Sequence, residues 1–304
     1  MAIVSPAILT ALNTGVKKNF QDGYKEFRAK SFWDKVATLI PSTTSSNTYG
    51  WLGDFPQLRE WVGDRVIRDM KASGYSIENK LYEATLGVQR TQIEDDQYGH
   101  FAPVASSMGQ EAAQHPDRLV QAVINSAGTS LCFDGQYFFD TDHPVYANVD
   151  GTGAATSVSN VEAGTDPAWY LLDCSKVLKP FIFQERTKPE LEMRFDPSTS
   201  EAAFIRDQYQ WGIRYRCNAG YGFWQLARKS QAALDATSFE AGRTSMRTLK
   251  GDGGRPLGIV PNILLVPPSL ESAADRVVNV KTLPNGGDNP NYGKATVVVM
   301  DWVA

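Results

Sequence analysis

Near the start of the chain, apolar residues recur at every fourth position and so fall on one side of a predicted helix. Ser5 followed by Pro6 resembles a helix N-cap with proline at the first helical position, so the helix is expected to begin there. A second helix is predicted over about residues 101–128, and Pro116 should break or restart it because proline lacks an N–H donor. The apolar stripe of the first helix consists of Ile8, Leu12, Val16, Phe20 and Tyr24.

Alternation of apolar and polar residues predicts strands in the middle of the chain. Between residues 178 and 196, the apolar Leu191 and Met193 alternate with charged residues, which indicates strands joined by a hairpin around Lys188 and Pro189. A stronger alternation follows and predicts a half-buried antiparallel strand. Its apolar side is formed by Tyr209, Trp211, Ile213, Tyr215 and Cys217.

The last seventy residues change to a pattern of helix, strand, helix and strand. Residues 238–249 and 269–280 read as helices, whereas residues 258–268 and 295–303 read as strands. This order predicts a compact α/β block in which helices pack on a small sheet. Residues 148–166 are small and polar, which is typical of an exposed loop or hinge.

Residues 39–86 carry many large apolar side chains without a sustained helical stripe. A segment of this length without a core of its own is unusual as an ordinary loop. We therefore predict an extension whose apolar groups find their partner elsewhere, either a ligand held in an aromatic cage or another copy of the protein. The family resemblance described below favours another copy. The expected anchors are Trp51, Phe55, Leu58, Trp61 and Tyr75.

Composition narrows the function classes. The chain of 304 residues is 42% hydrophobic and 21% charged, which is ordinary for a folded globular protein. No run approaches the roughly 20 apolar residues that span a bilayer, and the N-terminal residues lack the features of a signal peptide. We therefore expect a soluble protein made in a cytoplasm. The three cysteines, Cys132, Cys174 and Cys217, are far apart in sequence, which favours reduced thiols over a disulfide framework.

Charge is distributed unevenly but without a long block of one sign. The net charge of −4 disfavours tight DNA binding, although residues 17–35 contain six basic and three acidic side chains. This local excess is either an ordinary solvated helix face or a contact for a polyanion or an acidic partner. The candidate contact residues are Lys17, Lys18, Lys25, Arg28 and Lys30.

Catalytic chemistry is poorly represented. His100, His115 and His143 are too scattered for a three-histidine metal site, and neither a phosphate loop nor a serine nucleophile elbow is present. The crowded Asp140, Asp142 and His143 in "DTDHP" are interpreted as a turn, in which Asp142 accepts hydrogen bonds from nearby backbone amides before the proline. We predict no catalytic, cofactor-binding or metal-binding residues and no cofactor.

Six motifs, taken in order, resemble the major head subunit of Mu-like phages and prophages. They are "SNTYGWLGDFPQLREWVGDR", "GYSIENK", "CFDGQYFFDTDHPVYANVDGTG", "YLLDCSKVLKPFIFQERTKPEL", "AGYGFWQ" and "GDGGRPLGIVPNILLVPPSLE", and together they extend over nearly the whole chain. The resemblance implies an α+β protein with the Hong Kong 97-type capsid fold. It also implies a non-enzymatic major capsid protein that self-assembles into an icosahedral shell around double-stranded DNA.

The same resemblance suggests how the chain is divided. We assign residues 1–38 to an N-terminal arm, 39–86 to an extended loop, 87–231 to a peripheral domain with a long helix and long sheet, and 232–304 to an axial domain. The implied partners are other copies of the chain in pentamers and hexamers, with scaffold, portal and decoration proteins. Contact with packaged DNA should be weak and non-specific. The implied location is the virion, after assembly in the host bacterial cytoplasm.

Two alternatives remain open at this stage. An encapsulin-like compartment shell would share the architecture and would be recognised by an enzyme cargo. A metal-dependent enzyme built on "DTDHP" is the weaker alternative, because it rests on a single short motif.

Overall fold

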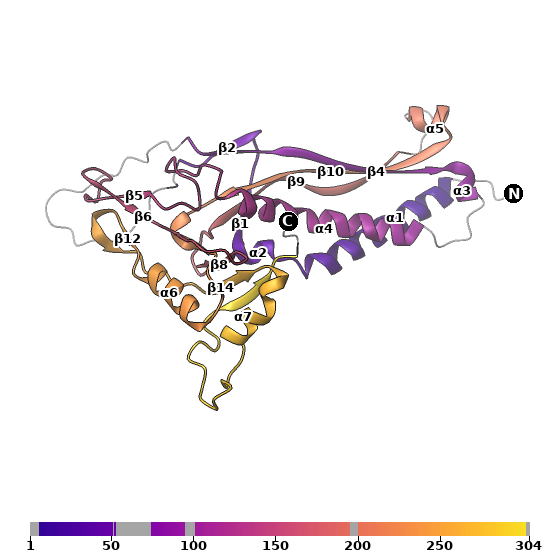
Figure 1. Ribbon diagram of the computed structural model, residues 1–304. Helices are drawn as coiled ribbons and strands as arrows, with labels where there is room; N and C mark the ends of the chain where they lie inside the picture. Colours follow the sequence, from indigo (N-terminus) through magenta and orange to yellow (C-terminus); the bar gives the residue numbers. More distant parts are fainter. Residues whose placement is uncertain (1–5, 51, 53–73, 95–100, 195–199, 302–304) are drawn as a thin grey trace.

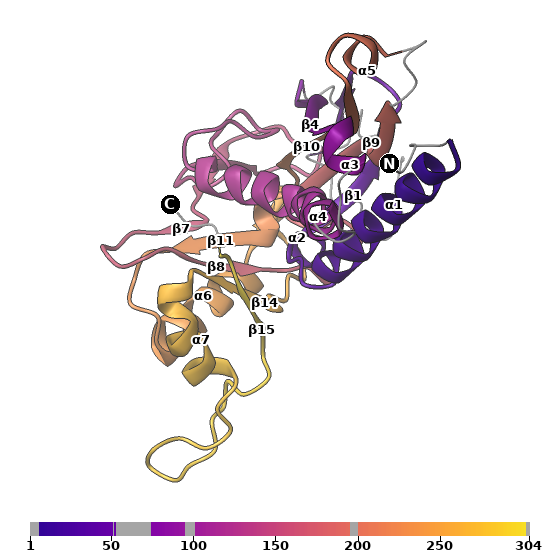
Figure 2. The same ribbon diagram turned by 90° about the vertical axis from the view of Figure 1, so that its right-hand side faces the viewer.

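The computed structural model describes residues 6–50, 52, 74–94, 101–194 and 200–301. Two long helices lie against a long, narrow sheet in one part of the molecule, and a second sheet with two shorter helices forms the other part (Figures 1 and 2). Among the described residues, no helix combines the length and the apolar character needed to cross a bilayer.

The long helices are α1 (Pro6–Arg28) and α4 (Phe101–Ser126), which pack side by side. The predicted break at Pro116 is wrong, because α4 continues through it. Pro116 is buried, and Asp117 beside it is 5% exposed. The Asp117 carboxylate accepts hydrogen bonds from the backbone N–H groups of Phe32 and Trp33, at 3.0 and 2.9 Å. Burial and tertiary hydrogen bonds therefore hold this turn although proline removes one helical bond.

Glycines allow α1 and α4 to approach closely. A methyl group on Gly109 of α4 would overlap the backbone carbonyl of Phe20, and one on Gly23 of α1 would overlap the carbonyl of Ser106. The two positions are reciprocal, since each helix contributes one glycine facing the other helix's backbone. The N-terminal helix thus depends on the absence of side chains at both points.

The long sheet has four strands in the order β1–β9–β10–β4. Strands β9 and β4 both pair antiparallel with β10, whereas β1 pairs parallel with β9. The predicted alternation in β10 is confirmed, because the five residues named for its apolar side are all buried. The strands are β1 (Ala37–Pro41), β4 (Lys80–Gln89), β9 (Phe181–Arg194) and β10 (Gln208–Tyr221).

The predicted hairpin around Lys188 and Pro189 is wrong, because β9 runs straight through both residues. The pairing explains how a strand accommodates this proline. Thr187 pairs with Arg216 and Glu190 pairs with Arg214, so two residues of β9 lie opposite a single residue of β10. This bulge removes the requirement for a ladder hydrogen bond from the proline nitrogen. The chain reverses later, around the short helix α5 (Glu201–Ile205).

His115 of α4 fills the space between the helix and the long sheet. Its ring centroid lies 4.1 Å from that of Tyr82 on β4 and 5.8 Å from that of Tyr215 on β10. Burial, followed by the nearby positive charge of Arg118, lowers the pKa of His115 below its ordinary value. The neutral imidazole therefore serves here as an aromatic packing group.

The second sheet has five strands in the order β15–β14–β8–β11–β7. The predicted helix–strand–helix–strand pattern of the last seventy residues is confirmed by α6 (Ala236–Arg247), β14 (Ile263–Val266), α7 (Glu271–Val278) and β15 (Thr296–Val299). The sheet also takes β7 (Val161–Glu162), β8 (Trp169–Leu172) and β11 (Ala227–Ser230) from earlier in the chain. Strands from before residue 232 thus complete the sheet of the C-terminal block.

The remaining short elements lie outside the two main sheets. They are α2 (Trp33–Val36), β2 (Ser46–Thr48), β3 (Ser76–Glu78), α3 (Arg90–Glu94), β5 (His143–Tyr146), β6 (Ala155–Val158), β12 (Lys250–Gly251) and β13 (Arg255–Pro256). Single 3-10 turns occupy residues 224–226, 252–254 and 268–270.

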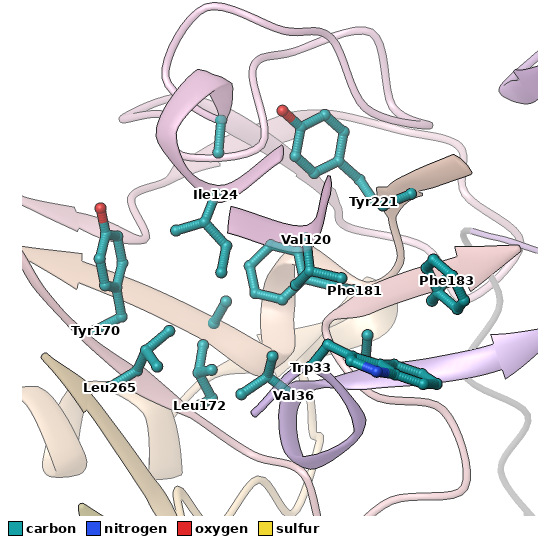
Figure 3. Packing of buried hydrophobic residues seen from close by; sticks show 14 of the residues in the cluster. Trp33, Val36, Val120, Ile124, Tyr170, Leu172, Phe181, Phe183, Tyr221 and Leu265 are labelled. Carbon is teal, nitrogen blue, oxygen red and sulfur yellow. The ribbon is translucent and has the colours of Figure 1, made fainter. Parts of the chain in front are cut away.

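One hydrophobic cluster joins α4 and both sheets (Figure 3). Val120 and Ile124 of α4 belong to the same cluster as Phe181 of the long sheet and Leu172 of the second sheet. All four are at most 2% exposed, and full burial of such a side chain contributes about 1.5–3 kcal/mol. The two parts of the molecule therefore share a core.

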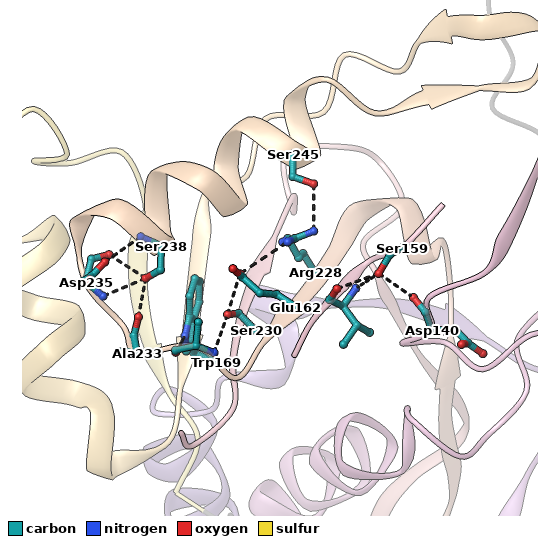
Figure 4. A network of polar contacts seen from close by, with 12 residues as sticks. Asp140, Ser159, Glu162, Trp169, Arg228, Ser230, Ala233, Asp235, Ser238 and Ser245 are labelled. Carbon is teal, nitrogen blue, oxygen red and sulfur yellow. Dashed lines mark hydrogen bonds and ion pairs between the residues drawn. The ribbon is translucent and has the colours of Figure 1, made fainter. Parts of the chain in front are cut away.

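A polar network fixes α6 to the outer strands of the second sheet (Figure 4). Arg228 of β11 donates to the Ser245 hydroxyl at 3.0 Å, and its guanidinium lies 3.6 Å from the Glu162 carboxylate on β7. Asp235 and Ser238 form a capping box at the start of α6. These contacts hold the helix at one position along the sheet.

The helix crossing yields a test with a built-in control. Gly109→Ala should lower the free energy of unfolding of the subunit by about 2 kcal/mol, since overpacking costs more than the better helix propensity of alanine returns. Gly15→Ala, on α1 where a methyl group would meet nothing within 4 Å, should raise it by up to about 1 kcal/mol. Denaturant unfolding of both variants measures the difference. Equal effects of the same sign would contradict the close crossing.

Candidate functional site

The predicted extended loop has a closed base. Strands β2 and β3 pair antiparallel, and the Tyr49 N–H donates to the Tyr75 carbonyl at 2.9 Å. The residues on the two sides of the predicted loop therefore lie side by side. Four of the predicted assembly anchors, Trp51, Phe55, Leu58 and Trp61, lie outside the described residues, so their predicted role stays a prediction.

Buried hydrogen bonds attach this base to the long sheet. The Tyr49 hydroxyl donates to Oε1 of Gln184 at 2.6 Å, and Nε2 of Gln184 donates to the Ile77 carbonyl at 3.1 Å. Gln184 is on β9 and fully buried. Since an unpaired buried amide is costly, Gln184 fixes where both strands of the base sit.

Tyr75, the fifth predicted anchor, makes its contacts inside its own chain. Its hydroxyl accepts a hydrogen bond from the Tyr221 N–H at 2.6 Å, and its ring centroid lies 6.3 Å from that of Tyr221. Burial is the main cause that raises the pKa of Tyr75 above its ordinary value. Gly220 leaves the room required, because a side chain there would overlap Ile77 and the Tyr75 hydroxyl. Tyr75 thus helps to hold the base of the loop, and its predicted role in assembly stays a prediction.

The five predicted basic contact residues divide into two groups. Lys17, Lys18 and Lys25 are exposed on α1 and fall within about 100° of its circumference. Arg28 instead pairs with Asp34 at 3.1 Å and stacks on the Trp33 ring. Lys30 pairs with Glu26 at 3.1 Å. The three exposed lysines are thus better placed for an anionic partner than the other two.

The "DTDHP" motif forms a turn, but its hydrogen bonds differ from the expectation. Asp140, rather than Asp142, accepts from backbone N–H groups, those of Tyr137 at 3.2 Å and Thr141 at 2.7 Å. The exposed Asp142 is bonded to Asp140, which raises the pKa of Asp142. His143 points inward and is fully buried. The acceptor for the neighbouring amides is thus Asp140, whereas Asp142 accepts from its own backbone N–H.

A cluster that the sequence analysis did not identify surrounds His143. Nδ1 of His143 lies 2.7 Å from one oxygen of Asp134, and the Cys132 thiol donates to the other oxygen at 3.0 Å. Its sequence signal is the short spacing of Cys132 and Asp134, with a histidine nine residues later. Nothing in that spacing alone indicates that the three side chains converge.

The geometry of this cluster does not resemble an activated nucleophile. A catalytic cysteine needs a base such as imidazole next to its sulfur. Here burial and the neighbouring Asp134 carboxylate raise the pKa of the Cys132 thiol, so it stays protonated. Burial alone would raise the pKa of Asp134, but hydrogen bonds from His143 and Cys132 outweigh it and lower that pKa. The cluster is therefore an ionised carboxylate held by two donors.

Comparison with known proteins supports the family resemblance that the six motifs indicated. The sequence profile of the family described as "Mu-like prophage major head subunit gpT" matches residues 9–303. The chain belongs to this family. It is 44% identical over 307 residues to the major capsid protein of Escherichia phage Mu, and the match covers 99% of the chain and 100% of that protein.

Solved capsid structures share the fold. A subunit from the procapsid of bacteriophage JBD30 has a TM-score of 0.86 and 52% identity, with 99% of this chain and 100% of that one covered. A subunit from a JBD30 capsid decorated with minor capsid protein trimers has a TM-score of 0.74 and 39% identity, with 90% and 91% covered. The predicted α+β capsid fold is confirmed, and so is the predicted function as the major capsid protein of a phage shell.

The intramolecular role of Tyr75 can be tested on the isolated subunit. Tyr75→Phe removes the acceptor for the buried Tyr221 N–H and should lower the free energy of unfolding by about 1–3 kcal/mol. Tyr292→Phe, at a tyrosine that is 53% exposed, should change it by less than about 0.5 kcal/mol. Denaturant unfolding gives both values. If the Tyr75 variant were as stable as the parent but failed to assemble, Tyr75 would act by direct contact with a neighbouring subunit and not by stabilising its own chain.

Proposed function

We propose that this chain assembles as pentamers and hexamers into an icosahedral shell around double-stranded DNA and that it has no catalytic role. The observation that carries the proposal is the closed base formed by β2, β3, Tyr49 and Tyr75. It fixes the two ends of an aromatic-rich segment side by side on the long sheet. A shell protein needs such segments, because surfaces that the subunit cannot cover itself must be covered by neighbours.

Within that shell, Trp51, Phe55, Leu58 and Trp61 serve as anchors on a neighbouring subunit. Aromatic side chains supply large contact areas, and burial contributes about 25 cal/mol per Å² of apolar surface. Each contact can remain modest, because every subunit touches several others. The division into arm, loop, peripheral and axial parts given above is retained, with β7, β8 and β11 added to the axial sheet.

Other partners follow from the same role. The exposed lysines of α1 offer a surface for an acidic scaffold protein or, weakly, for packaged DNA. A portal protein is a further expected partner. Decoration proteins are expected too, because the JBD30 relative carries minor capsid protein trimers. Synthesis and assembly take place in the bacterial cytoplasm before the protein becomes part of the virion.

Removing two aromatic anchors should separate assembly from folding. In an expression system where the parent chain forms particles, Trp51→Ala combined with Trp61→Ala should abolish or strongly reduce them, because the apolar contact area is lost. Thermal unfolding of the isolated subunit should stay cooperative. Electron microscopy and sedimentation measure the particles, and calorimetry measures the folding.

The matched control keeps the aromatic area. Trp51→Phe combined with Trp61→Phe should restore most of the particle yield. If the alanine variant instead loses cooperative unfolding as an isolated subunit, the two tryptophans belong to the subunit's own core and the proposed loop contacts are wrong.

DNA affinity should be weak because a shell must release the genome that it encloses. Duplex DNA titrated against the free subunit should bind without sequence preference, and the affinity should collapse between low and physiological salt as counterions compete. Changing Lys17, Lys18 and Lys25 together to Ala should weaken low-salt binding. Lys30→Ala should have a smaller effect, because Lys30 is already paired with Glu26.

The same titration can reject the passive-container role. Sub-micromolar binding that survives physiological salt, or a clear preference for one DNA sequence, would show that this protein reads DNA. An acidic protein used in place of DNA tests the scaffold contact separately.

A further inference from the structure

The Cys132–Asp134–His143 cluster is built on a tight turn. The Cys132 N–H donates to the Gln136 carbonyl at 2.8 Å, and the Gly135 N–H donates to the Cys132 carbonyl at 3.2 Å. Gly135 has a φ of +87°, a left-handed conformation that glycine adopts without strain. This turn places the Cys132 sulfur and the Asp134 carboxylate on the same side of the backbone, 3.0 Å apart.

His143 completes the cluster from the first position of β5. Its ring stacks on Trp224, with the centroids 3.9 Å apart and the planes 8° from parallel. The imidazole is fully buried, and its Nε2 has no hydrogen-bond partner among the described residues. Packing therefore fixes the ring with Nδ1 directed at Asp134.

The three side chains offer one ligand atom each, and these atoms lie within 4.8 Å of one another. A metal ion bound to sulfur at about 2.3 Å and to nitrogen or oxygen at about 2.0–2.2 Å holds its ligand atoms at comparable separations. A metal ion placed between them would replace the present bonds of 2.7 and 3.0 Å. We propose that Cys132, Asp134 and His143 bind a divalent transition-metal ion, preferentially Zn²⁺, as a structural site.

The ligand types select the metal. A thiolate and an imidazole disfavour Mg²⁺ and Ca²⁺, which prefer oxygen, and together with a carboxylate they suit Zn²⁺. Binding displaces the thiol proton to solvent and moves the imidazole proton from Nδ1 to Nε2, so that Nδ1 is free to bind the metal. Thiolate and carboxylate together then balance the two positive charges. Water can reach the site most easily beside Asp134, because the Asp134 side chain is 11% exposed, whereas His143 is fully buried and Cys132 is 5% exposed. A water molecule on that side would take the fourth position.

The location gives such a site a structural purpose. Cys132 belongs to the same buried cluster as Ile124, near the end of α4, and Trp224, in the 3-10 turn directly before β11. A metal ion here would tie the loop after α4 to the first residue of β5, whose ring stacks on Trp224. This inference concerns the folded subunit and does not depend on how the shell assembles.

The parent subunit provides the first test. After treatment with a chelator, it is titrated with Co²⁺, a probe for zinc sites, and separately with Zn²⁺. The expected results are one metal ion bound per chain, visible absorption of tetrahedral cobalt with a thiolate charge-transfer band, and a higher melting temperature with Zn²⁺. Failure to bind either metal at micromolar concentration would overturn the proposal and leave a purely hydrogen-bonded cluster.

Variants then identify the ligands. Cys132→Ser should remove the thiolate band. Loss of a group that only hydrogen-bonds to a metal ligand typically weakens metal binding ~10–100-fold, so Cys132→Ser and His143→Gln, which remove ligands, should each raise the Kd for Zn²⁺ by more than that. Cys174→Ser, at the half-buried cysteine outside the cluster, should leave band and affinity unchanged. A thiolate band that survives Cys132→Ser would place the metal elsewhere and reject the site.

Discussion

The packing of α4 against both α1 and the long sheet is the constraint on which the rest of the structure depends. One side of this helix meets α1 through Gly109, and the other meets the sheet through His115. Its C-terminal half then supplies Val120 and Ile124 to the core that both sheets share. Because all these contacts lie along a single rigid element, a shift of α4 would disturb the helix pair, the long sheet and the shared core together.

Buried polar side chains fix the geometry both at the base of the loop and in the Cys132–Asp134–His143 cluster. Gln184 and His143 are both fully buried polar groups held at defined positions by hydrogen bonds. Buried polar groups tolerate few alternative arrangements, because each lost bond leaves a desolvated donor or acceptor. Such groups set positions that hydrophobic packing alone leaves adjustable. In this protein they fix the base of the predicted loop and the turn after α4.

The sequence predicted elements with strong periodicity and missed features that depend on partners distant in sequence. The α1 stripe, the alternation of β10 and the helix–strand order of the last seventy residues all appear as expected, since side-chain period is a local property. The predictions at Pro116 and Pro189 were wrong because the features that accommodate these prolines are not local. Tertiary burial accommodates Pro116 within α4, and a bulge accommodates Pro189 within β9. Tyr75 could not be placed because its partner Tyr221 is 146 residues away. The Cys132 cluster was missed for a different reason, because no side-chain period describes an irregular loop, even where its bonded residues are only two and nine positions apart.

In the part of the chain that the structure describes, β4 is the last strand of the long sheet, and its pairing with β10 satisfies only one of its two edges. An open edge ten residues long is a template on which other chains can add as strands. A capsid protein accumulates to high concentration before shells close, so such an edge carries a risk of misassembly. Exposed charges at Lys80 and Glu83 make this edge a poor template, because burying them against a foreign strand costs desolvation energy. The strand thereby discriminates against amyloid-like stacking while its subunit awaits its proper neighbours.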